Sequence, residues 1–292
     1  MRLHVVDGTF ELYRAHFSKR PEQRAPDGRD VKATLGLLSS LLTLLQDASE
    51  RVTHLAVAFD NPIVSFRNAL FEDYKSDAGV PPELRAQFDL VEEGVRALGV
   101  VVWSMDRYEA DDALATAARR WRDEVEQVRL LTPDKDLGQC LVDRRVVQVD
   151  RVRQREIDVA ALEAQRGVRP ESLPDYLALV GDSADGIPGI PGFGARTAAT
   201  LLAEYPHLEQ IPERAEDWRV AVRGAERLAS TLAARRDDAL LYRRLATLVE
   251  DVPLRESLAD LEWRGASRRA LGDFLERTGG AALLDRLHLA RD

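Results

Sequence analysis

Carboxylate side chains follow four short apolar runs in this 292-residue sequence: three of the runs end in acid, and the fourth is followed within about six residues by an acidic segment. The acids that follow these runs are Asp7, Asp60, Glu109, Asp111, Asp112, Asp134 and Asp136. A further pair, Asp182 and Asp185, stands just before a loop rich in glycine and proline. Oxygen ligands without histidine or cysteine suit Mg²⁺ or Mn²⁺ rather than zinc. Two such ions, about 4 Å apart, can bind the attacking and leaving oxygens of a phosphodiester.

The four apolar runs are predicted to be buried strands of one sheet. They are Leu3–Val6, His54–Phe59, Val100–Trp103 and Val128–Leu131. Helical patterns lie between them, over residues 35–45, about 83–98 and 111–122. Strands that alternate with helices predict an α/β fold with a mostly parallel central sheet and helices on both faces. Ligands of such sheets bind at the carboxyl ends of the strands, so we expect the acids along one edge.

Each of these acids, taken singly, also fits a helix cap or a turn residue. Acids from four separate segments are expected at the same edge, however, where their charges would repel one another. A bound cation is the usual reason for such a cluster. Because no serine–histidine or cysteine–histidine arrangement accompanies the acids, the pattern predicts hydrolysis by a water that metal ions activate.

The composition is compatible with this interpretation. Hydrophobic residues make up 45% of the sequence, which suffices for a sizeable core, and Cys140 is the only cysteine. The net charge of −9 equals the number of candidate acids, so we expect the remaining surface to be balanced. No apolar stretch is long enough to span a membrane, and no signal-peptide core precedes Asp7. We expect a reduced, soluble, cytoplasmic protein.

Residues 186–194 (GIPGIPGFG) form a connection suited to holding phosphate groups. A predicted helix over residues 170–180 precedes it, and a second over residues 195–204 follows. The glycines expose backbone N–H groups near the start of the second helix, where anions bind. The loop lacks the ending of a Walker loop and the third glycine of a dinucleotide-binding motif. An ordinary helix–loop–helix corner is the alternative, and the two acids just before the loop favour the phosphate site.

Basic and aromatic residues lie near the acidic segments. Arg14 follows the first predicted strand, and Arg67, Tyr74 and Lys75 follow the second, on a predicted helix. Arginine or lysine beside a scissile phosphate offsets developing charge, and a tyrosine can stack on an unpaired base. The alternative is that these residues form a solvated helix face.

Several segments resemble the 5′ nuclease family, which includes the N-terminal 5′→3′ exonuclease domain of bacterial DNA polymerase I and free-standing flap endonucleases. They are VDGTFELYRA (6–15), AVAFDNPIVSFRNALFEDYKS (56–76), YEADDALAT (108–116), TPDKDLGQCL (132–141) and PDYLALVGDSADGIPGIPGFGARTAATLLAEY (174–205). The resemblance covers nearly the whole chain, in order, and the motifs around Asp111 and Asp182 are highly specific. With no polymerase segment before Asp292, we expect a free-standing member.

The resemblance implies a PIN-like 5′ nuclease domain over residues 1–168. A helix-three-turn-helix DNA-binding and C-terminal helical region would follow over residues 169–292. Residues 62–98 would form an arch or clamp for a 5′ single strand. This chain has no basic residue between Lys75 and Arg85, where the family clamp is more basic, and Pro133 stands where the family has a small residue.

The resemblance also implies roles for individual residues. One metal group would comprise Asp7, Asp60, Glu109, Asp111 and Asp112, and a second Asp134, Asp136, Asp182 and Asp185. The residues with an implied catalytic role are Arg14, Arg67, Lys75, Asp111 and Asp134. Those with an implied DNA contact are Arg14, Arg67, Tyr74, Lys75, Gly189, Gly192, Gly194, Arg196 and Thr197. Besides two or more Mg²⁺ or Mn²⁺ ions, the family implies K⁺ on carbonyl oxygens of the 186–194 loop.

The implied function is a metal-dependent, structure-specific 5′ nuclease of primer removal and DNA repair. It would cut DNA at a 5′ flap, nick or recessed 5′ end, and RNA primers on DNA would be further substrates. Hydrolysis would follow a two-metal mechanism and leave products with a 5′-phosphate. We expect a monomer without a membrane partner. The alternatives are a catalytically weak, structure-specific DNA-binding module and a PIN-type endoribonuclease. A sequence that lacked some of the nine acids would favour the DNA-binding module. An endoribonuclease of this type needs no loop that grips duplex DNA, so the loop at residues 186–194 speaks against it.

Overall fold

The computed structural model describes residues 1–286 and divides into two compact units. The first unit contains residues 1–64, 77–132 and the chain from 250 onward, and the second contains residues 65–76 and 133–249. This division differs from the predicted border at residue 168, because residues 65–76 and residues 250–286 pack on elements distant in sequence. The end of the second predicted region, residues 287–292, lies outside the described residues.

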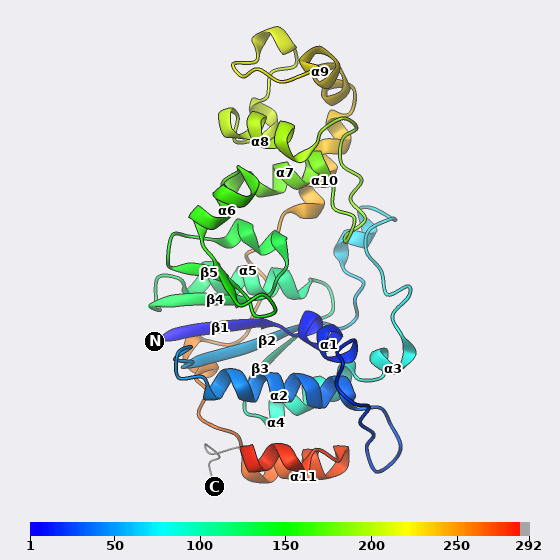
Figure 1. The fold of residues 1–292 in the computed structure, drawn as a ribbon, viewed down its shortest axis with the longest axis vertical. Helices are drawn as coiled ribbons and strands as arrows, with labels where there is room; N and C mark the ends of the chain where they lie inside the picture. The colour runs from blue at the N-terminus through cyan, green and yellow to red at the C-terminus, as the bar shows by residue number, and fades with distance from the viewer. Residues whose placement is uncertain (287–292) are drawn as a thin grey trace. The chain divides into compact units, whose positions relative to one another are not determined.

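Four parallel strands form the sheet of the first unit (Figure 1). They are β1 (Arg2–Asp7), β2 (His54–Asp60), β3 (Val101–Met105) and β4 (Gln127–Leu131), in the order β3-β2-β1-β4. The sequence prediction of these strands is confirmed. Most of their residues are apolar and buried, as expected for a parallel sheet covered on both faces. Asp7 pairs in register with Ala58, so Asp7 and Asp60 end neighbouring strands at the same edge.

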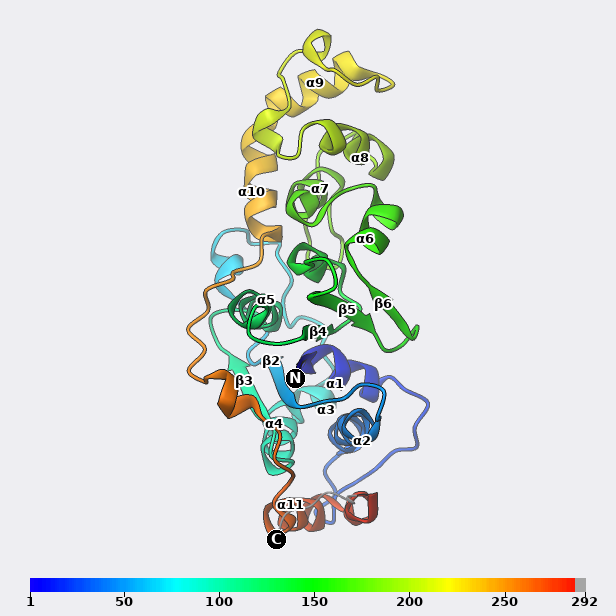
Figure 2. The same ribbon diagram turned by 90° about the vertical axis from the view of Figure 1, so that its left-hand side faces the viewer.

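Helices cover both faces of this sheet, which confirms the predicted α/β arrangement. α5 (Ala110–Trp121) lies on one face, and α1 (Gly8–His16), α2 (Lys32–Gln46) and α4 (Phe88–Ala97) lie on the other (Figures 1 and 2). The pattern over residues 83–98 forms two helices, because α3 (Pro82–Arg85) ends before α4 begins.

Residues 250–286 return to the first unit. The indole of Trp103 donates a hydrogen bond of 3.0 Å to the carboxylate of Glu256, and Trp263 donates one of 3.0 Å to the carbonyl of Leu98. α11 (Arg268–Thr278) then packs on α4, where the absence of a side chain at Gly94 leaves room for the ring of Phe274. These contacts hold residues 250–286 to the first unit.

A buried histidine and a glutamate lie in the first unit away from the acids discussed above. His4 Nε2 lies 3.1 Å from a carboxylate oxygen of Glu50, and Arg129 Nε lies 2.9 Å from the same carboxylate. The hydrogen bond from His4, together with the charge of Arg129, lowers the pKa of Glu50 to about 2 although burial opposes the shift. Burial lowers the pKa of His4, so His4 is neutral at pH 7.

Both shifts predict that acid destabilises the first unit. A carboxylate whose pKa is lowered in the folded state stabilises that state above pH 4.5, and this contribution disappears as the pH falls towards about 2. Protonation of His4 in the unfolded chain adds to the loss below pH 6.5. We expect Glu50→Gln to lower the free energy of unfolding at pH 7, with a difference from the unmodified chain that shrinks towards pH 2. Urea unfolding across this range would measure it, and a constant difference would contradict it.

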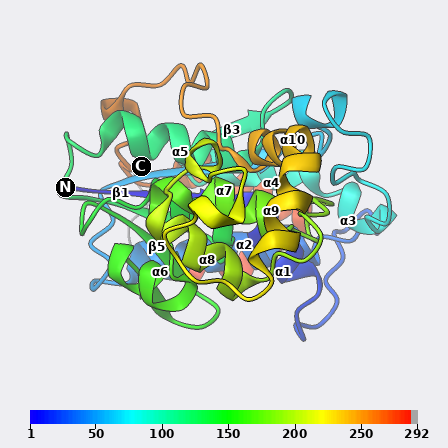
Figure 3. The same ribbon diagram turned by 90° about the horizontal axis from the view of Figure 1, so that it is seen from above.

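The second unit is mainly helical, as predicted for the C-terminal region. An antiparallel pair, β5 (Val146–Asp150) and β6 (Arg155–Ile157), precedes α6 (Val159–Arg166). α7 (Leu173–Val180), α8 (Ala195–Glu204), α9 (Ala225–Ala234) and α10 (Arg236–Ala246) follow and can be traced in Figures 2 and 3. α7 packs on α10 through a core that includes Leu177 and Leu245. The two predicted helices that flank the glycine-rich loop are confirmed as α7 and α8.

Residues 65–76 do not form the helix that the sequence predicted. Only the short 3₁₀ helix η1 (Phe66–Ala69) is present, and it begins with a capping box between Ser65 and Asn68. The side chain of Asn68, within η1, donates hydrogen bonds to the carbonyls of Tyr74 and Lys75, at 3.3 and 2.9 Å. The prediction was wrong because these side-chain bonds replace the backbone bonds of a helix.

None of the helices in residues 1–286 is both long and apolar enough to cross a lipid bilayer.

Candidate functional site

Asp7 and Asp60 lie at the carboxyl ends of two neighbouring strands. Asp7 is the N-cap of α1: one carboxylate oxygen accepts a 2.8 Å hydrogen bond from the backbone N–H of Phe10, and the other accepts one of 3.0 Å from the hydroxyl of Thr132. The carboxylate of Asp60 accepts a 2.7 Å bond from the backbone N–H of Ala110, at the start of α5. Caps and strand ends therefore hold both buried acids at the predicted edge.

Glu109, Asp111 and Asp112 stand at the N-terminus of α5. Glu109 is the N-cap, and a capping box links it to Asp112, whose carboxylate accepts a 3.0 Å bond from the backbone N–H of Glu109. Glu109 and Asp112 are buried, and Asp111 is half-buried. The bond between Asp60 and Ala110 brings Asp60 to this turn, so the structure places these four acids around one helix start. The N-terminus of a helix carries a partial positive charge, which stabilises negatively charged carboxylates there.

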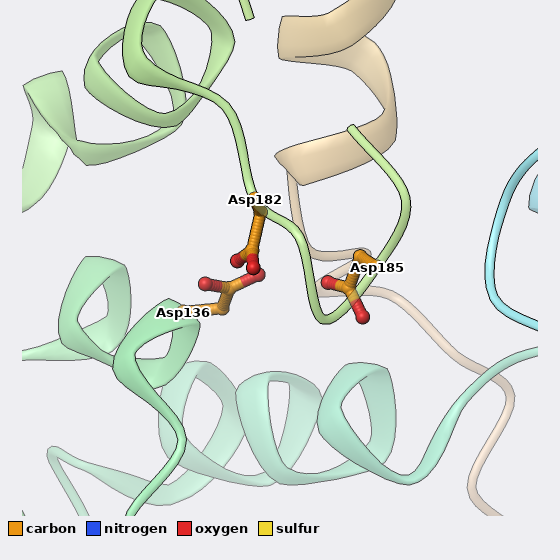
Figure 4. A group of neighbouring side chains, drawn as sticks. All are labelled: Asp136, Asp182 and Asp185. Atoms are coloured by element: carbon orange, nitrogen blue, oxygen red, sulfur yellow. The ribbon is translucent and has the colours of Figure 1, made fainter. Parts of the chain in front are cut away.

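Three acids of the second predicted group meet in the second unit. Carboxylate oxygens of Asp136, Asp182 and Asp185 lie within 4.8 Å of one another (Figure 4). Asp136 belongs to the 3₁₀ helix η2 (Lys135–Cys140), and the other two come from the loop after α7. Asp182 and Ile187 exchange backbone hydrogen bonds of 2.8 and 2.7 Å, which closes this loop into a tight turn. We call Asp136, Asp182 and Asp185 the second-unit cluster.

The electrostatics of the second-unit cluster indicate a cation site. Burial, and then the charges of three neighbouring acids, raise the pKa of Asp136 well above its ordinary value. One carboxylate oxygen of Asp136 is buried and has no hydrogen-bond partner among the described residues. A divalent cation would satisfy this oxygen and offset the repulsion, so the donor set fits Mg²⁺ or Mn²⁺.

Two further side chains border the second-unit cluster. Asp134 caps η2, since its carboxylate accepts a 2.9 Å hydrogen bond from the backbone N–H of Asp136. Lys135 forms an ion pair with Asp182. Burial lowers the pKa of Lys135, but this ion pair and the adjacent acids outweigh burial and raise the pKa above its ordinary value. Lys135 is therefore a cation that partly neutralises the cluster.

The loop before α8 presents the predicted phosphate-binding groups. Gly192, Gly194 and Arg196 are exposed, Thr197 is half-buried, and Gly194 is the N-cap of α8 without a side-chain cap. Gly189 is buried at a φ of 74°, and a Cβ there would lie 2.5 Å from the backbone nitrogen of Gly181. Gly189 therefore shapes the loop, whereas the exposed residues leave the start of α8 accessible to an anion.

Sequence reasoning missed one basic residue beside this loop. The guanidinium of Arg227, on α9, lies near Gly192, since a Cβ built at Gly192 would be 3.5 Å from Arg227 Nη1. Arg227 is exposed. The charge-rich stretch around it carries no motif, so only the packing of α9 reveals its position.

Arg14 is held by polar partners on α1 and α2. It forms an ion pair with the buried carboxylate of Glu11, and its guanidinium donates a 3.0 Å hydrogen bond to the hydroxyl of Ser40. About a third of the Arg14 side chain (36%) is exposed. Its guanidinium is therefore positioned yet partly open to solvent.

The structure does not place Arg67 and Tyr74 on the surface, where their predicted DNA contacts would require them. Arg67 is 1% exposed, and its guanidinium donates hydrogen bonds of 2.9 Å to the carbonyls of Leu245 and Thr247 at the end of α10. Tyr74 is 4% exposed and belongs to the core of the second unit. The prediction of exposure was wrong because the partners of both residues are far away in sequence. Lys75, in contrast, is half-buried, and its ammonium lies 3.8 Å from a carboxylate oxygen of Asp185.

Family models match both parts of the chain. Residues 2–167 match the 5′-3′ exonuclease N-terminal resolvase-like domain, and residues 168–269 match the 5′-3′ exonuclease C-terminal SAM fold. The chain belongs to the 5′-3′ exonuclease family. The resemblance inferred from the sequence motifs is thereby confirmed.

Two relatives with similar sequences are DNA polymerases. DNA polymerase I of Rhizobium leguminosarum is 38% identical over 258 residues, which are 86% of this chain and 25% of that protein. DNA polymerase I of Bacillus subtilis is 32% identical over 290 residues, which are 98% of this chain and 32% of that protein. The chain thus spans about a quarter to a third of the length of these relatives.

Solved structures share the fold at low sequence identity. The bacteriophage T5 flap endonuclease, in a complex with DNA and metal ions, has a TM-score of 0.65 at 20% identity and covers 96% of this chain and 100% of its own. The catalytic core of Rad2, in complex with a DNA substrate, has a TM-score of 0.63 at 14% identity and covers 98% of this chain and 90% of its own. These similarities show that the 5′-3′ exonuclease family fold extends over the chain.

Proposed function

We propose that this chain is a metal-dependent, structure-specific 5′ nuclease. It hydrolyses DNA at 5′ flaps, nicks and recessed 5′ ends, including RNA primers on DNA, and leaves 5′-phosphate products. The second-unit cluster carries the proposal, because a carboxylate oxygen of Asp136 is buried without a hydrogen-bond partner among the described residues and stands beside two further acids. Membership of the 5′-3′ exonuclease family supports the polarity of cleavage.

Two or more Mg²⁺ or Mn²⁺ ions would be held by the nine acids. The first group of ligands is Asp7, Asp60, Glu109, Asp111 and Asp112, and the second group is Asp134, Asp136, Asp182 and Asp185. When bound, such ions polarise the phosphodiester and lower the pKa of water, which is the two-metal chemistry of many nucleases. The metal-ion complex of the T5 flap endonuclease supports this assignment. We also propose K⁺ on carbonyl oxygens of the 186–194 loop.

The chain's own cations and backbone amides would bind and orient the DNA. Lys75 and Arg14 would offset the negative charge of the scissile phosphate, and Asp111 and Asp134 complete the catalytic set. The loop with Gly189, Gly192 and Gly194, followed by Arg196 and Thr197, would hold duplex phosphates. Residues 1–168 would act as the nuclease domain, with residues 62–98 as the arch, and residues 169–292 would bind DNA. We propose a monomer that acts in primer removal and repair.

Arg227 extends the proposed duplex contact. Arg227→Gln removes a cation beside the loop, so we expect weaker binding of all duplex substrates. The slope of the logarithm of the association constant against the logarithm of the salt concentration should decrease in magnitude by about one. Fluorescence anisotropy in EDTA at several salt concentrations would measure both quantities. Arg244→Gln, at an exposed position on α10, is the matched control. Equal slopes for the two variants would remove Arg227 from the interface.

Cleavage of a labelled flap tests the proposed function. A 5′-labelled flap duplex, the matching single strand and a nicked duplex would each be incubated with Mg²⁺, Mn²⁺ or EDTA. We expect cutting near the flap junction with either metal, no cutting in EDTA, and little cutting of the single strand. Tight flap binding without cutting would overturn the catalytic proposal in favour of a binding module. Cleavage of structured RNA with no action on the flap would indicate an endoribonuclease instead.

A further inference from the structure

Residues 65–76 form a compact turn that Asn68 closes from inside. The side-chain oxygen of Asn68 accepts a 2.9 Å hydrogen bond from the backbone N–H of Ser65. Its side-chain nitrogen donates to the carbonyls of Tyr74 and Lys75, at 3.3 and 2.9 Å. One half-buried side chain therefore links Ser65, at the start of the segment, to Lys75, near its end.

The end of this segment is attached to the loop that carries two acids of the second-unit cluster. The backbone N–H of Lys75 donates a 3.1 Å hydrogen bond to the carbonyl of Asp185. Beside it, Gly186 has a φ of 75°, and a Cβ there would lie 2.2 Å from the carbonyl oxygen of Asp73. A side chain at position 186 would push the two backbones apart. The contact between the segment and the loop thus depends on a glycine.

These contacts decide where the Lys75 ammonium lies. The backbone of Lys75 is held by Asn68 through its carbonyl and by Asp185 through its N–H. With both backbone groups held, the half-buried side chain places its ammonium 3.8 Å from the Asp185 carboxylate. A lysine has a long, flexible side chain, so fixing its backbone limits the positions that the charge can reach.

We propose that Asn68 and Gly186 are positioning residues that hold Lys75 at the second-unit cluster. The inference rests on the proposed function, in which Lys75 offsets the charge of the scissile phosphate. Asn68 and Gly186 touch neither the phosphate nor the metal ions; they act through the backbone of Lys75. A displacement of about 1 Å at a catalytic group can lower a rate by up to about a hundredfold.

Hydrogen exchange at the Lys75 amide tests the positioning directly. The variants are Asn68→Ala, Asn68→Asp and Gly186→Ala. Asn68→Asp keeps the oxygen that accepts from Ser65 but loses the nitrogen that donates to Tyr74 and Lys75. Gly224→Ala is the matched control, because Gly224 also has a positive φ, of 74°, but a Cβ there would meet no other atom within 4 Å. We expect about tenfold faster exchange at Lys75 in the first three variants and no change in the control. Unchanged exchange in Asn68→Asp and Gly186→Ala would overturn the proposal.

A double-mutant cycle tests whether the effect on cleavage passes through Lys75. We expect Asn68→Asp to lower kcat for the flap by about tenfold or more in the unmodified chain and by less than about twofold in the Lys75→Ala background. Equal losses in both backgrounds would assign Asn68 a general structural role and overturn the proposal. If the unmodified chain cuts no flap with either metal, the proposed function fails, whereas the exchange experiment still decides whether Asn68 and Gly186 hold Lys75.

Discussion

Replacing Asp185 by asparagine is expected to lower the single-turnover rate of flap cleavage by about three orders of magnitude. The substitution removes a charge from a cluster whose acids lie within 4.8 Å of one another, and the proposed divalent ion would lose a ligand there. Loss of metal-ion stabilisation of a phosphoryl transition state costs several kcal/mol, which corresponds to about this factor. Rapid quench with saturating enzyme and Mg²⁺ would measure the rate.

The matched control for this prediction is Asp237→Asn, an exposed aspartate of the second unit outside the cluster. It removes the same charge and should leave the rate within about twofold, as surface substitutions usually do. Asp111→Asn, in the first proposed group of ligands, should also lower the rate by about three orders of magnitude. A normal rate for Asp185→Asn would refute the metal site of the second unit.

Replacing Arg67 by alanine is expected to lower the free energy of unfolding by about 3 kcal/mol. The guanidinium is buried and donates to two carbonyls at the end of α10, and these carbonyls would lose their partners. It also packs on the ring of Phe66, 4.7 Å from the ring centroid, so the variant leaves a cavity. Urea unfolding at pH 7 would measure the change.

The control for Arg67 is Arg244→Ala, on α10 itself, where the side chain is exposed and the loss of stability should be below about 0.5 kcal/mol. The experiment also separates two roles. Removing a side chain that packs in the core lowers both the free energy of unfolding and the activity. Removing one that only contacts DNA lowers cleavage and leaves the unfolding curve unchanged. The second result would contradict the interior position of Arg67.

Local patterns in the sequence were sufficient for much of the architecture. Apolar runs followed by acids predicted β1, β2, β3 and β4, because a buried parallel strand is a continuous apolar stretch and its end faces the ligand edge. The glycine-rich loop and its two flanking helices were likewise readable, since proline and glycine restrict backbone angles through their own chemistry. These features depend on neighbours within a few residues.

Contacts between distant segments were not readable in the same way. The segment after β2 carries an arginine, a tyrosine and a lysine at spacings that also fit a solvated helix. Whether each is exposed depends on α10 and on the loop at Asp185, more than a hundred residues further along the chain. Arg227 shows the same limit, because its place beside Gly192 follows from how α9 packs.

The sequence by itself therefore determined the candidate acids, the strands whose ends carry several of them, and the family. The tertiary structure decided which charged side chains are available for chemistry. It buried Arg67 and Tyr74 and left Lys75 beside Asp185. It also buried Asp136 among other acids, so that burial, and then their charges, raise the pKa of Asp136. The physical reason is that strand and turn formation follow from local backbone and side-chain preferences, whereas burial and electrostatic environment are set by every segment that packs around a group.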